Sequence, residues 1–215
     1  MTILITGANR GVGRGLLDHY RAAGKRTIGT TRGAAGDDWI TLDVTDPEAQ
    51  CAMAGKLDGV PIDLLVCNAG VLFDRDDEID HGYPADKWAQ MLATNVTGVF
   101  LTVQSLLPNL RAAKGKVAII ASQLGSSTIA SGGRLIYCAS KAAAINLGAN
   151  LAQELKGDGI AVGSYHPGWV QTDMGGETAA ITVAESVAGL TDRFAALSLG
   201  NTGCFETHDG QPHPF

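Results

Sequence analysis

A tyrosine and a lysine four residues apart are the side chains in this sequence best suited to proton transfer. Tyr137 and Lys141 begin a stretch with helical periodicity, and this spacing puts both side chains on one face of a helix. A phenol with its ordinary pKa of about 10 is a poor proton shuttle at neutral pH, but a neighbouring ammonium draws that pKa toward the working range. The pair therefore predicts a proton shuttle in which Tyr137 is the acid and base.

The same spacing occurs a second time, at Tyr83 and Lys87. Tyr83 precedes Pro84, and a residue before proline is pushed away from helical geometry. The argument that both side chains share one helix face therefore fails for this pair. We expect Tyr83 in a loop and Lys87 on a helix surface.

Two further polar residues are candidates to assist Tyr137. Ser122 follows an apolar strand predicted at 116–121, at the carboxyl edge of the sheet, where ligands bind in such folds. Its hydroxyl can donate to a substrate carbonyl as charge develops on the oxygen, although a polar residue at a strand end is an equally good interpretation. Asn95 lies inside a predicted long helix, where asparagine is a mediocre helix former. Asn95 is a functional residue, a tolerated polar residue in the helix, or a residue at a local bend of the helix.

A glycine-rich turn lies between the first predicted strand and the first predicted helix. Gly7 permits a tight turn, Gly11 lets the backbone approach a pyrophosphate, and Gly13 lets the helix pack close to the strand. The helix that follows offers free N–H groups and the positive end of its dipole to phosphates. A loop that merely needs positive φ is the alternative, but the strand–turn–helix context favours a dinucleotide.

Basic residues near the second strand bear on which dinucleotide binds. NAD sites commonly place Asp or Glu there for the 2′-hydroxyl of the adenosine ribose, whereas Arg accommodates a 2′-phosphate. The second strand is followed by Arg32, and Arg10 in the glycine turn is a second candidate. We therefore expect NADP(H). Asp37 and Asp38 follow closely, so NAD(H) is the alternative.

These residues are carried by a chain in which predicted strands and helices alternate. Asp46 is the expected N-cap of the second helix, with Pro47 at its first position. The alternation indicates a single α/β domain, a Rossmann-type doubly wound parallel sheet with helices on both faces. Strands are predicted near 2–6, 26–31, 38–42, 62–67, 116–121, 160–165 and 203–207, and helices near 11–23, 46–57, 85–110, 136–156 and 182–197.

Two connections are shorter than this fold usually requires. The second and third strands are separated only by Arg32 to Asp37, whereas parallel strands normally need a crossover of about a dozen residues. An extended return or a single turn is just long enough to bring the chain back to the start of a parallel strand. An antiparallel edge strand is the alternative. Either arrangement leaves one edge of the sheet thinly covered. Asp173 to Ile181 is likewise short for a substrate lid. We expect an open pocket walled by Leu72, Gln123, Leu124, Trp169 and Met174.

Composition narrows the class of protein. The 215 residues include 28 glycines, are 45% hydrophobic and carry a net charge of −6. The acidic balance argues against a nucleic-acid binder, and no window approaches the run of about 20 apolar residues that crosses a bilayer. Four cysteines without CxxC spacing, in a chain with no recognisable export signal, favour reduced thiols in a cytoplasm. The histidine spacings give little support for a metal site.

Together the motifs resemble the short-chain dehydrogenase/reductase family, and most of all its compact C-factor-like carbonyl-reductase branch. In family order they are TGANRGVG at 6–13, LDV at 42–44, NAG at 68–70, Asn95, Ser122, YCASK at 137–141 and HPGWVQT at 166–172. The resemblance implies NADP(H)-dependent hydride transfer between nicotinamide C4 and a small carbonyl or alcohol substrate.

The resemblance also implies a role for each site residue. Tyr137 would be the acid and base, and Ser122 would polarise the carbonyl. Lys141 would bind the nicotinamide ribose and lower the tyrosine pKa, while Asn95 would hold a relay water. The implied cofactor-binding residues are Gly7, Asn9, Arg10, Gly11, Val12, Gly13, Arg32, Asp43, Val44, Asn68, Ala69, Gly70, Tyr137, Lys141, Pro167, Gly168, Val170 and Thr172.

Two alternatives stay open at the level of sequence. The chain could be a non-catalytic dinucleotide-binding signalling or regulatory protein on the same scaffold, although the intact Ser–Tyr–Lys set weighs against this. The resemblance also suggests a homodimer formed through the helices at 85–110 and 136–156. Small residues in the second helix allow close approach or, equally, packing on the sheet: Ala142, Ala143, Ala149 and Ala152.

Overall fold

The computed structural model describes residues 1–33 and 36–215. Within these ranges, seven strands form one sheet in the order β3-β2-β1-β4-β5-β6-β7, and every neighbouring pair is parallel. The order reverses between β1 and β4, which is the position where such sheets open a crevice for ligands. The strands are β1 (Thr2–Ile5), β2 (Arg26–Thr31), β3 (Trp39–Thr41), β4 (Leu64–Cys67), β5 (Lys116–Ile120), β6 (Ala161–His166) and β7 (Phe205–Thr207).

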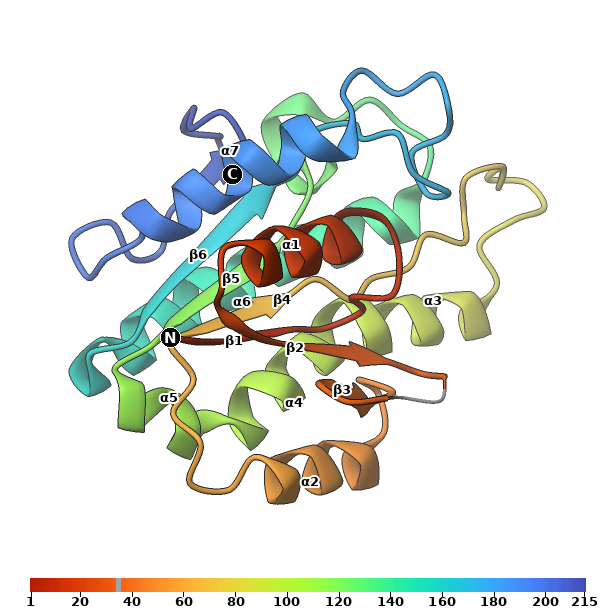
Figure 1. Cartoon of the computed structure of the whole chain (residues 1–215). Helices are drawn as coiled ribbons and strands as arrows, with labels where there is room; N and C mark the ends of the chain where they lie inside the picture. Colours follow the sequence, from red (N-terminus) through yellow and green to blue (C-terminus); the bar gives the residue numbers. More distant parts are fainter. Residues whose placement is uncertain (34–35) are drawn as a thin grey trace.

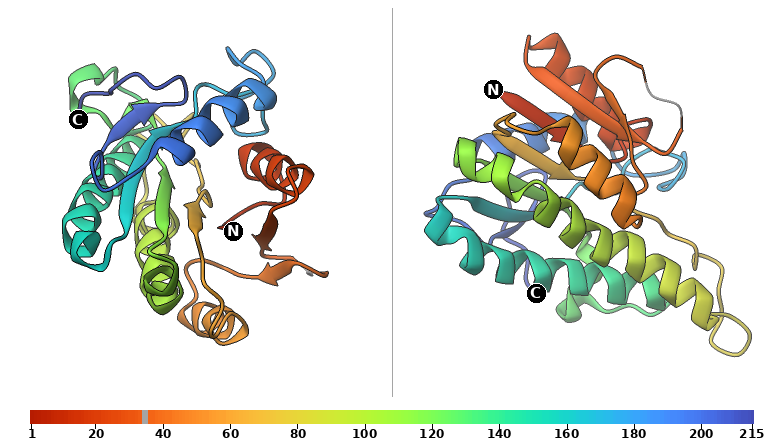
Figure 2. Two further views of the ribbon diagram at one scale, coloured as in Figure 1. Left: turned by 60° about the vertical axis from the view of Figure 1, so that its left-hand side comes forward. Right: turned by 90° about the horizontal axis from the view of Figure 1, so that it is seen from below.

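Helices cover both faces of this sheet, so the predicted Rossmann-type architecture is confirmed (Figures 1 and 2). α1 and α7 pack on one face, where Leu16 and Phe194 belong to one core with residues of β1, β4 and β6. α2, α4 and α6 pack on the other, where Met53, Val103 and Leu151 join a second core. The helices are α1 (Gly11–Ala22), α2 (Pro47–Lys56), α3 (Ala85–Leu92), α4 (Gly98–Ser105), α5 (Leu107–Ala113), α6 (Leu135–Leu155) and α7 (Val183–Ala196).

Local signals explain where several elements begin. Asp46 accepts a hydrogen bond from the Glu48 N–H at 2.9 Å, so the predicted N-cap of α2 is confirmed. α7 opens with a reciprocal capping box between Thr182 and Glu185. β4 is buried along its whole length, which accounts for the uninterrupted apolar run LLVC.

The prediction of one continuous helix over 85–110 is wrong. α3 passes through a π-helical turn at Ala93–Thr97 into α4, and the chain then bends by 59° before α5, which extends to Ala113. Leu106 leaves helical geometry at the bend, and Pro108 in the first turn of α5 lacks the N–H that would continue the earlier ladder. Among the described residues, no single helix is long and apolar enough to cross a membrane, although this bent pair passes that test by length and composition.

The edge of the sheet at β2 and β3 is parallel, so the antiparallel alternative is excluded. Ala34 and Ala35, in the middle of the short connection, lie outside the described residues. The ring of Trp39 lies against Gly29, where an added Cβ would come within 2.9 Å of it, and the Arg21 guanidinium lies 5.7 Å from the centroid of that ring. An aromatic side chain and an arginine thus cover a strip of sheet that a helix would usually cover.

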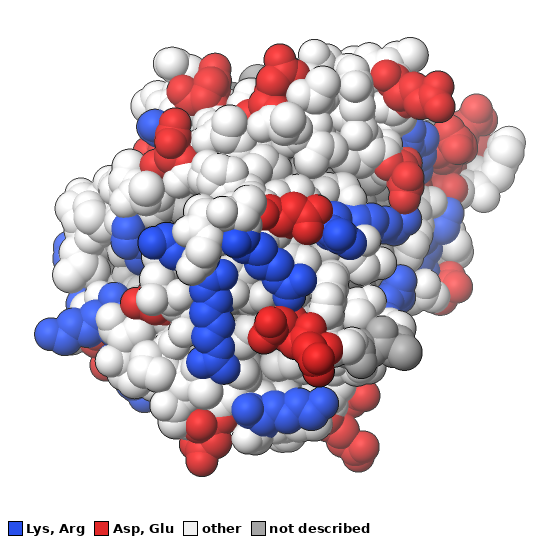
Figure 3. Space-filling view, in the orientation of Figure 1, with Lys and Arg blue, Asp and Glu red and all other residues white. Residues whose placement is uncertain are grey.

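Charged side chains of both signs are interspersed on the face seen in Figure 3. This distribution agrees with the modest net charge of −6. Lys and Arg side chains form a band across the middle of this face, with Asp and Glu beside them and along its edges (Figure 3).

Candidate active site

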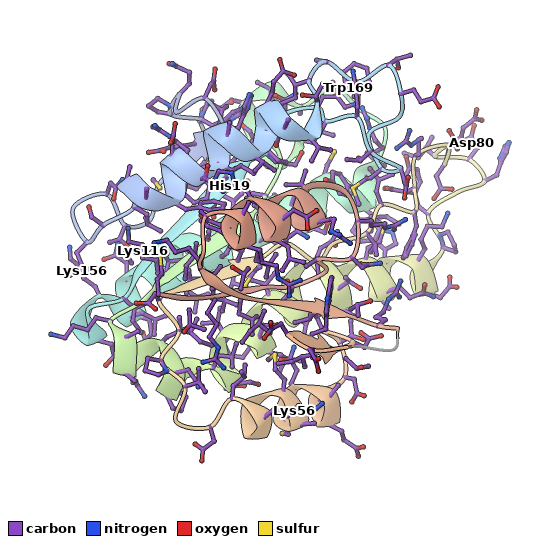
Figure 4. The ribbon with its side chains drawn as sticks, viewed as in Figure 1. His19, Lys56, Asp80, Lys116, Lys156 and Trp169 are labelled. Carbon is purple, nitrogen blue, oxygen red and sulfur yellow. The ribbon has the colours of Figure 1, made fainter. Side chains whose placement is uncertain are left out.

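A cleft of about 1150 Å³ lies at the carboxyl ends of the parallel strands. In Figure 4, Trp169 and Asp80 lie toward this end of the molecule, and Lys116 and Lys156 lie toward the opposite end. The cleft is lined by all the predicted cofactor residues and by Ser122: Gly7, Asn9, Arg10, Gly11, Val12, Gly13, Arg32, Asp43, Val44, Asn68, Ala69, Gly70, Ser122, Tyr137, Lys141, Pro167, Gly168, Val170 and Thr172. The predicted pocket walls, Leu72, Gln123, Leu124, Trp169 and Met174, line it too.

The backbone geometry and close contacts of the glycine turn require glycine at three positions. Gly7 and Gly11 have φ angles of +63° and +56°, a region that side chains disfavour. At Gly13 an added Cβ would lie 2.4 Å from the Asn68 amide nitrogen, so only glycine fits there. Asn68 Nδ2 in turn donates to the carbonyl oxygens of Thr6 and Gly7 at 2.9 and 3.0 Å. The side chain of the N-cap residue Arg10 makes no capping hydrogen bond to the first N–H groups of α1 within the described residues. The residues that carry these N–H groups border the cleft.

Two arginines, Arg10 and Arg32, line the cleft together with the carboxylate of Asp43, which hydrogen bonds hold in place. Asp43 Oδ1 accepts from the N–H and the hydroxyl of Thr45 at 2.9 and 2.7 Å. These hydrogen bonds, with a smaller contribution from the charge of Arg32, lower the pKa of Asp43. Arg10 pairs with Asp173 at 2.9 Å, but both side chains are mostly exposed, so the pair is weak enough to exchange for another anion.

Ser122, Tyr137 and Lys141 come together because a strand end faces the first turns of a helix. Ser122 follows β5 in extended conformation, and Tyr137 is in the first turn of α6 with 8% of its surface exposed. Lys141 is 5% exposed, and its Nζ donates to the Ile120 carbonyl at 2.9 Å. The same nitrogen lies 5.7 Å from the centroid of the Tyr137 ring.

The predicted lowering of the tyrosine pKa is wrong for this structure. Burial raises the pKa of Tyr137 to about 12, and a hydrogen bond with Ser122 offsets only part of the rise. Burial also lowers the pKa of Lys141 to about 8. Removing the phenol from water therefore outweighs the hydrogen bond with Ser122 and the charge of Arg134, and the phenol holds its proton at neutral pH.

Asn95 lies behind the cleft wall, in the π-helical turn between α3 and α4. It is 1% exposed; its Oδ1 accepts from the Val71 N–H at 2.8 Å, and its Nδ2 donates to the Val71 carbonyl at 2.9 Å and to Ser140 Oγ at 3.0 Å. The helix is locally irregular here, because Asn95 lies in the π-helical turn Ala93–Thr97; the 59° bend lies farther along the chain, before α5. Asn95 thus ties the segment after β4 to α6, and its part in a proton relay stays a prediction.

The second tyrosine–lysine pair is placed as predicted. Tyr83 lies in the loop before α3 with a φ of +60°, and its hydroxyl donates to the Asp77 carbonyl at 3.0 Å. Lys87, on α3, forms an ion pair with the Asp77 carboxylate at 2.7 Å.

The short segment between β6 and α7 is tied across the cleft from two sides. Trp169 Nε1 donates to the Gly175 carbonyl at 2.8 Å, which folds the segment on itself. Arg75 donates to the Met174 carbonyl from one side, and Arg10 reaches Asp173 from the other. Trp169, one of the predicted pocket walls, remains 53% exposed.

Sequence reasoning missed residues around the site that act through tertiary contacts. Asp74 and Ser140 hold the first turns of α6, while Arg75 and Arg134 line the cleft. Ser140 lies inside the YCASK motif and could have been noticed there. The other three are charged residues in loops, and no local pattern distinguishes them from solvated surface.

Comparisons with known proteins agree with this geometry. The family model for short chain dehydrogenases matches residues 1–181. The 1-hydroxy-2-glutathionyl-2-methyl-3-butene dehydrogenase of Rhodococcus sp. (strain AD45) is 32% identical over 227 aligned positions, covering 97% of each chain. The NADPH-bound carbonyl reductase from chicken fatty liver superposes with a TM-score of 0.91 at 29% identity, covering 100% of this chain and 98% of the other. An NADP-bound short-chain dehydrogenase/reductase from Burkholderia multivorans gives a TM-score of 0.90 at 30% identity, with coverage of 100% and 99%. The chain belongs to the short-chain dehydrogenase family.

Proposed function

We propose that the protein is an NADP(H)-dependent oxidoreductase that reduces a carbonyl compound or oxidises the corresponding alcohol. The observation that carries the proposal is the position of Ser122, Tyr137 and Lys141 in the same cleft as the glycine turn. A cleft that only stored a dinucleotide would need the turn but not a buried phenol, hydroxyl and ammonium beside it.

The cofactor, when bound, supplies or accepts the hydride. The first N–H groups of α1 and the turn Gly11–Gly13 would hold its pyrophosphate. Arg10 and Arg32 are the candidate partners of a 2′-phosphate, next to Asp43 and Val44 on the adenine side. The NADP-bound and NADPH-bound relatives support NADP(H) over NAD(H). Asn68, Ala69, Gly70 and Lys141 would hold the ribose groups, and Pro167, Gly168, Val170 and Thr172 would flank the nicotinamide; all of them line the cleft.

Tyr137 is the general acid in reduction and the general base in oxidation. In reduction its phenol gives a proton to the carbonyl oxygen of the substrate, and in oxidation the phenolate takes one from the alcohol. Burial raises the pKa of Tyr137 to about 12, so the phenol carries its proton at neutral pH, as proton donation requires. Ser122 donates a hydrogen bond to the same substrate oxygen, and the Lys141 ammonium stabilises the phenolate left behind.

A non-catalytic regulatory protein on the same scaffold is the competing hypothesis, and substrate turnover separates the two. We expect NADPH consumption with at least one member of a broad panel of aldehydes and ketones, and a lower KM for NADPH than for NADH. Silence across the panel together with tight NADPH binding would favour the regulatory protein. A preference for NADH would contradict the assignment of Arg10 and Arg32.

A homodimer and a cytoplasmic location stay predictions. Of the alanines that could allow close approach of two copies, Ala142 is exposed on α6, whereas Ala152 is fully buried in the core. α6 lies beside α3 on one side of the molecule (Figure 2, right). A monomer mass in light scattering would reject the dimer.

A further inference from the structure

Asp74 is a buried carboxylate outside the predicted set of site residues. It follows β4 in the segment that begins at Val71, and none of its surface is exposed. A charge removed from water must be compensated by partners. Its Oδ2 accepts hydrogen bonds from the backbone N–H groups of Ile136 and Tyr137, at 2.8 and 3.1 Å. Among the described residues, Oδ1 has no partner, so the hydrogen bonds of this side chain are directed entirely into α6.

The amino-terminal end of α6 explains why such a partner is needed. A helix leaves its first N–H groups without internal partners, and these are normally served by the side chain of the N-cap residue. The N-cap here is Arg134, which has a left-handed backbone with φ of +49° and makes no side-chain cap within the described chain. Asp74 therefore caps α6 from a distant part of the sequence, and its negative charge is favourable at the positive end of the helix dipole.

Tyr137 is one of the two residues that this carboxylate holds, and it is also held on its other side. Its N–H donates to Asp74, and its carbonyl accepts from Ser140 Oγ at 2.8 Å. Ser140 Oγ in turn accepts from Asn95 Nδ2 at 3.0 Å. Two buried polar side chains from different segments thus fix the peptide groups on both sides of the candidate acid. Fraying of the first turn of α6 would move the phenol relative to Ser122.

The segment that carries Asp74 also forms a wall of the cleft. Leu72, Phe73 and Arg75 line the cleft, while the carboxylate between them points into the protein and reaches α6. One side chain therefore connects this wall to the helix that carries the acid. The charge of Asp74 also adds to burial in raising the pKa of Tyr137, which favours the protonated phenol.

We propose that Asp74 is a positioning residue of the reaction: it caps α6 and thereby holds the Tyr137 phenol in place between Ser122 and the cleft wall. This inference rests on the proposed oxidoreductase function. Asp74 need not contact the substrate or the cofactor to play this role. Its signature is a loss of kcat with cofactor binding preserved.

Three substitutions at this position and one control test the proposal. Asp74→Ala removes the acceptor, and a displacement of the phenol by about 1 Å is expected to lower kcat by about 10²-fold. Asp74→Asn keeps an acceptor oxygen for the two N–H groups and should recover most of that loss. The KM for NADPH should change by no more than about twofold in either variant, because the glycine turn and α1 are untouched. Thermal unfolding should show that each variant is folded at the assay temperature.

Asp77→Asn is the matched control. It removes a carboxylate from the same segment that pairs with Lys87 and does not reach α6. It should leave kcat unchanged. An equal loss of kcat in Asp77→Asn and Asp74→Ala would show that the segment merely needs to be rigid, and would overturn the proposal.

Two further outcomes would also overturn it: full kcat in Asp74→Ala, or a folded Asp74→Asn as slow as Asp74→Ala. If Asp74→Ala does not fold, Asp74→Glu is tested in its place. Glutamate keeps the acceptor oxygens, but its additional methylene displaces the first turn of α6. It should lower kcat at an unchanged KM for NADPH, and full kcat would contradict the role. Absence of turnover in the unsubstituted protein would instead contradict the proposed function itself.

Discussion

Two tyrosine–lysine pairs with identical spacing lie in very different surroundings in this protein. Lys87 is neutralised by the Asp77 carboxylate at 2.7 Å, and the Tyr83 hydroxyl donates to the backbone of the same residue. Lys141 is buried and donates to a backbone carbonyl, so its charge has no counter-ion among the ion pairs of the described residues. One pair fastens a loop to α3, and the other borders the cleft.

The difference comes from where the helix begins. Tyr83 precedes Pro84 and has left-handed backbone geometry, so it is outside α3, which starts at Ala85. Tyr137 is inside the first turn of α6, opposite the end of β5. A spacing of four residues therefore indicates chemistry only when both residues are in one helix and a strand end faces them.

The largest effect that separates the pairs should come from the two lysines. Lys141→Met removes the ammonium that stabilises the phenolate, and kcat/KM for a carbonyl substrate should fall by about 10²- to 10³-fold, as for other buried electrostatic donors. Lys87→Met should stay within about twofold of the unsubstituted protein. Equal losses in steady-state assays of both variants would show that the pairs are not functionally distinct.

The pH dependence should follow Lys141 as well. Burial lowers its pKa to about 8, so the ammonium is present below that pH and is lost as the pH rises through it. We expect kcat/KM for NADPH to decline on the alkaline side with a pKa of about 8, because this ratio reports groups of the free enzyme. Lys141→Arg should move the decline to much higher pH, since guanidinium stays protonated. An unchanged alkaline limb in that variant would assign the limb to another group.

Cations at the far end of the cleft should affect binding rather than turnover. Arg10→Gln or Arg32→Gln removes a candidate partner of the 2′-phosphate, and each should raise the KM for NADPH by about tenfold, equivalent to about 1.4 kcal/mol. The KM for NADH should change little. A parallel rise for both cofactors would mean that these arginines do not recognise the 2′-phosphate.

The smallest effect should come from the loop pair. Asp77→Asn removes the ion pair with Lys87 and should lower the melting temperature slightly without changing kcat. The hydrogen bond from Lys87 lowers the pKa of Asp77, so the stabilisation is present above the ordinary carboxyl pKa and is lost as the pH falls toward the lowered one. Melting curves of the two proteins should therefore converge in acid. A constant difference at all pH values would point to a cause other than the ion pair.

The sheet and the cleft could be predicted from sequence because their signals are local. Apolar runs such as LLVC identify strands buried on both faces, and the glycine turn carries its conformational requirement in Gly7, Gly11 and Gly13. Strand ends of a parallel sheet meet at one edge, so the sequence predicts Ser122 at that edge, where it lines the cleft.

The remaining features depend on contacts between distant segments. Asp74 caps a helix more than sixty positions away, and its neighbours in the sequence give no sign of this. The rise in the pKa of Tyr137 is caused by burial, and the spacing between Tyr137 and Lys141 in the sequence gives no information about burial. The bend at Leu106 was overlooked because apolar periodicity continues on both sides of it, although Pro108 was a local signal for it.

The most direct test of the account is a pair of tyrosine substitutions assayed with NADPH and a carbonyl substrate that the unsubstituted protein reduces. Tyr137→Phe should lower kcat by about 10²- to 10⁴-fold, the usual contribution of a general acid, while the Kd for NADPH stays nearly unchanged. Tyr83→Phe should match the unsubstituted protein in both. Full turnover in Tyr137→Phe would contradict the role of this phenol and with it the proposed reaction centre.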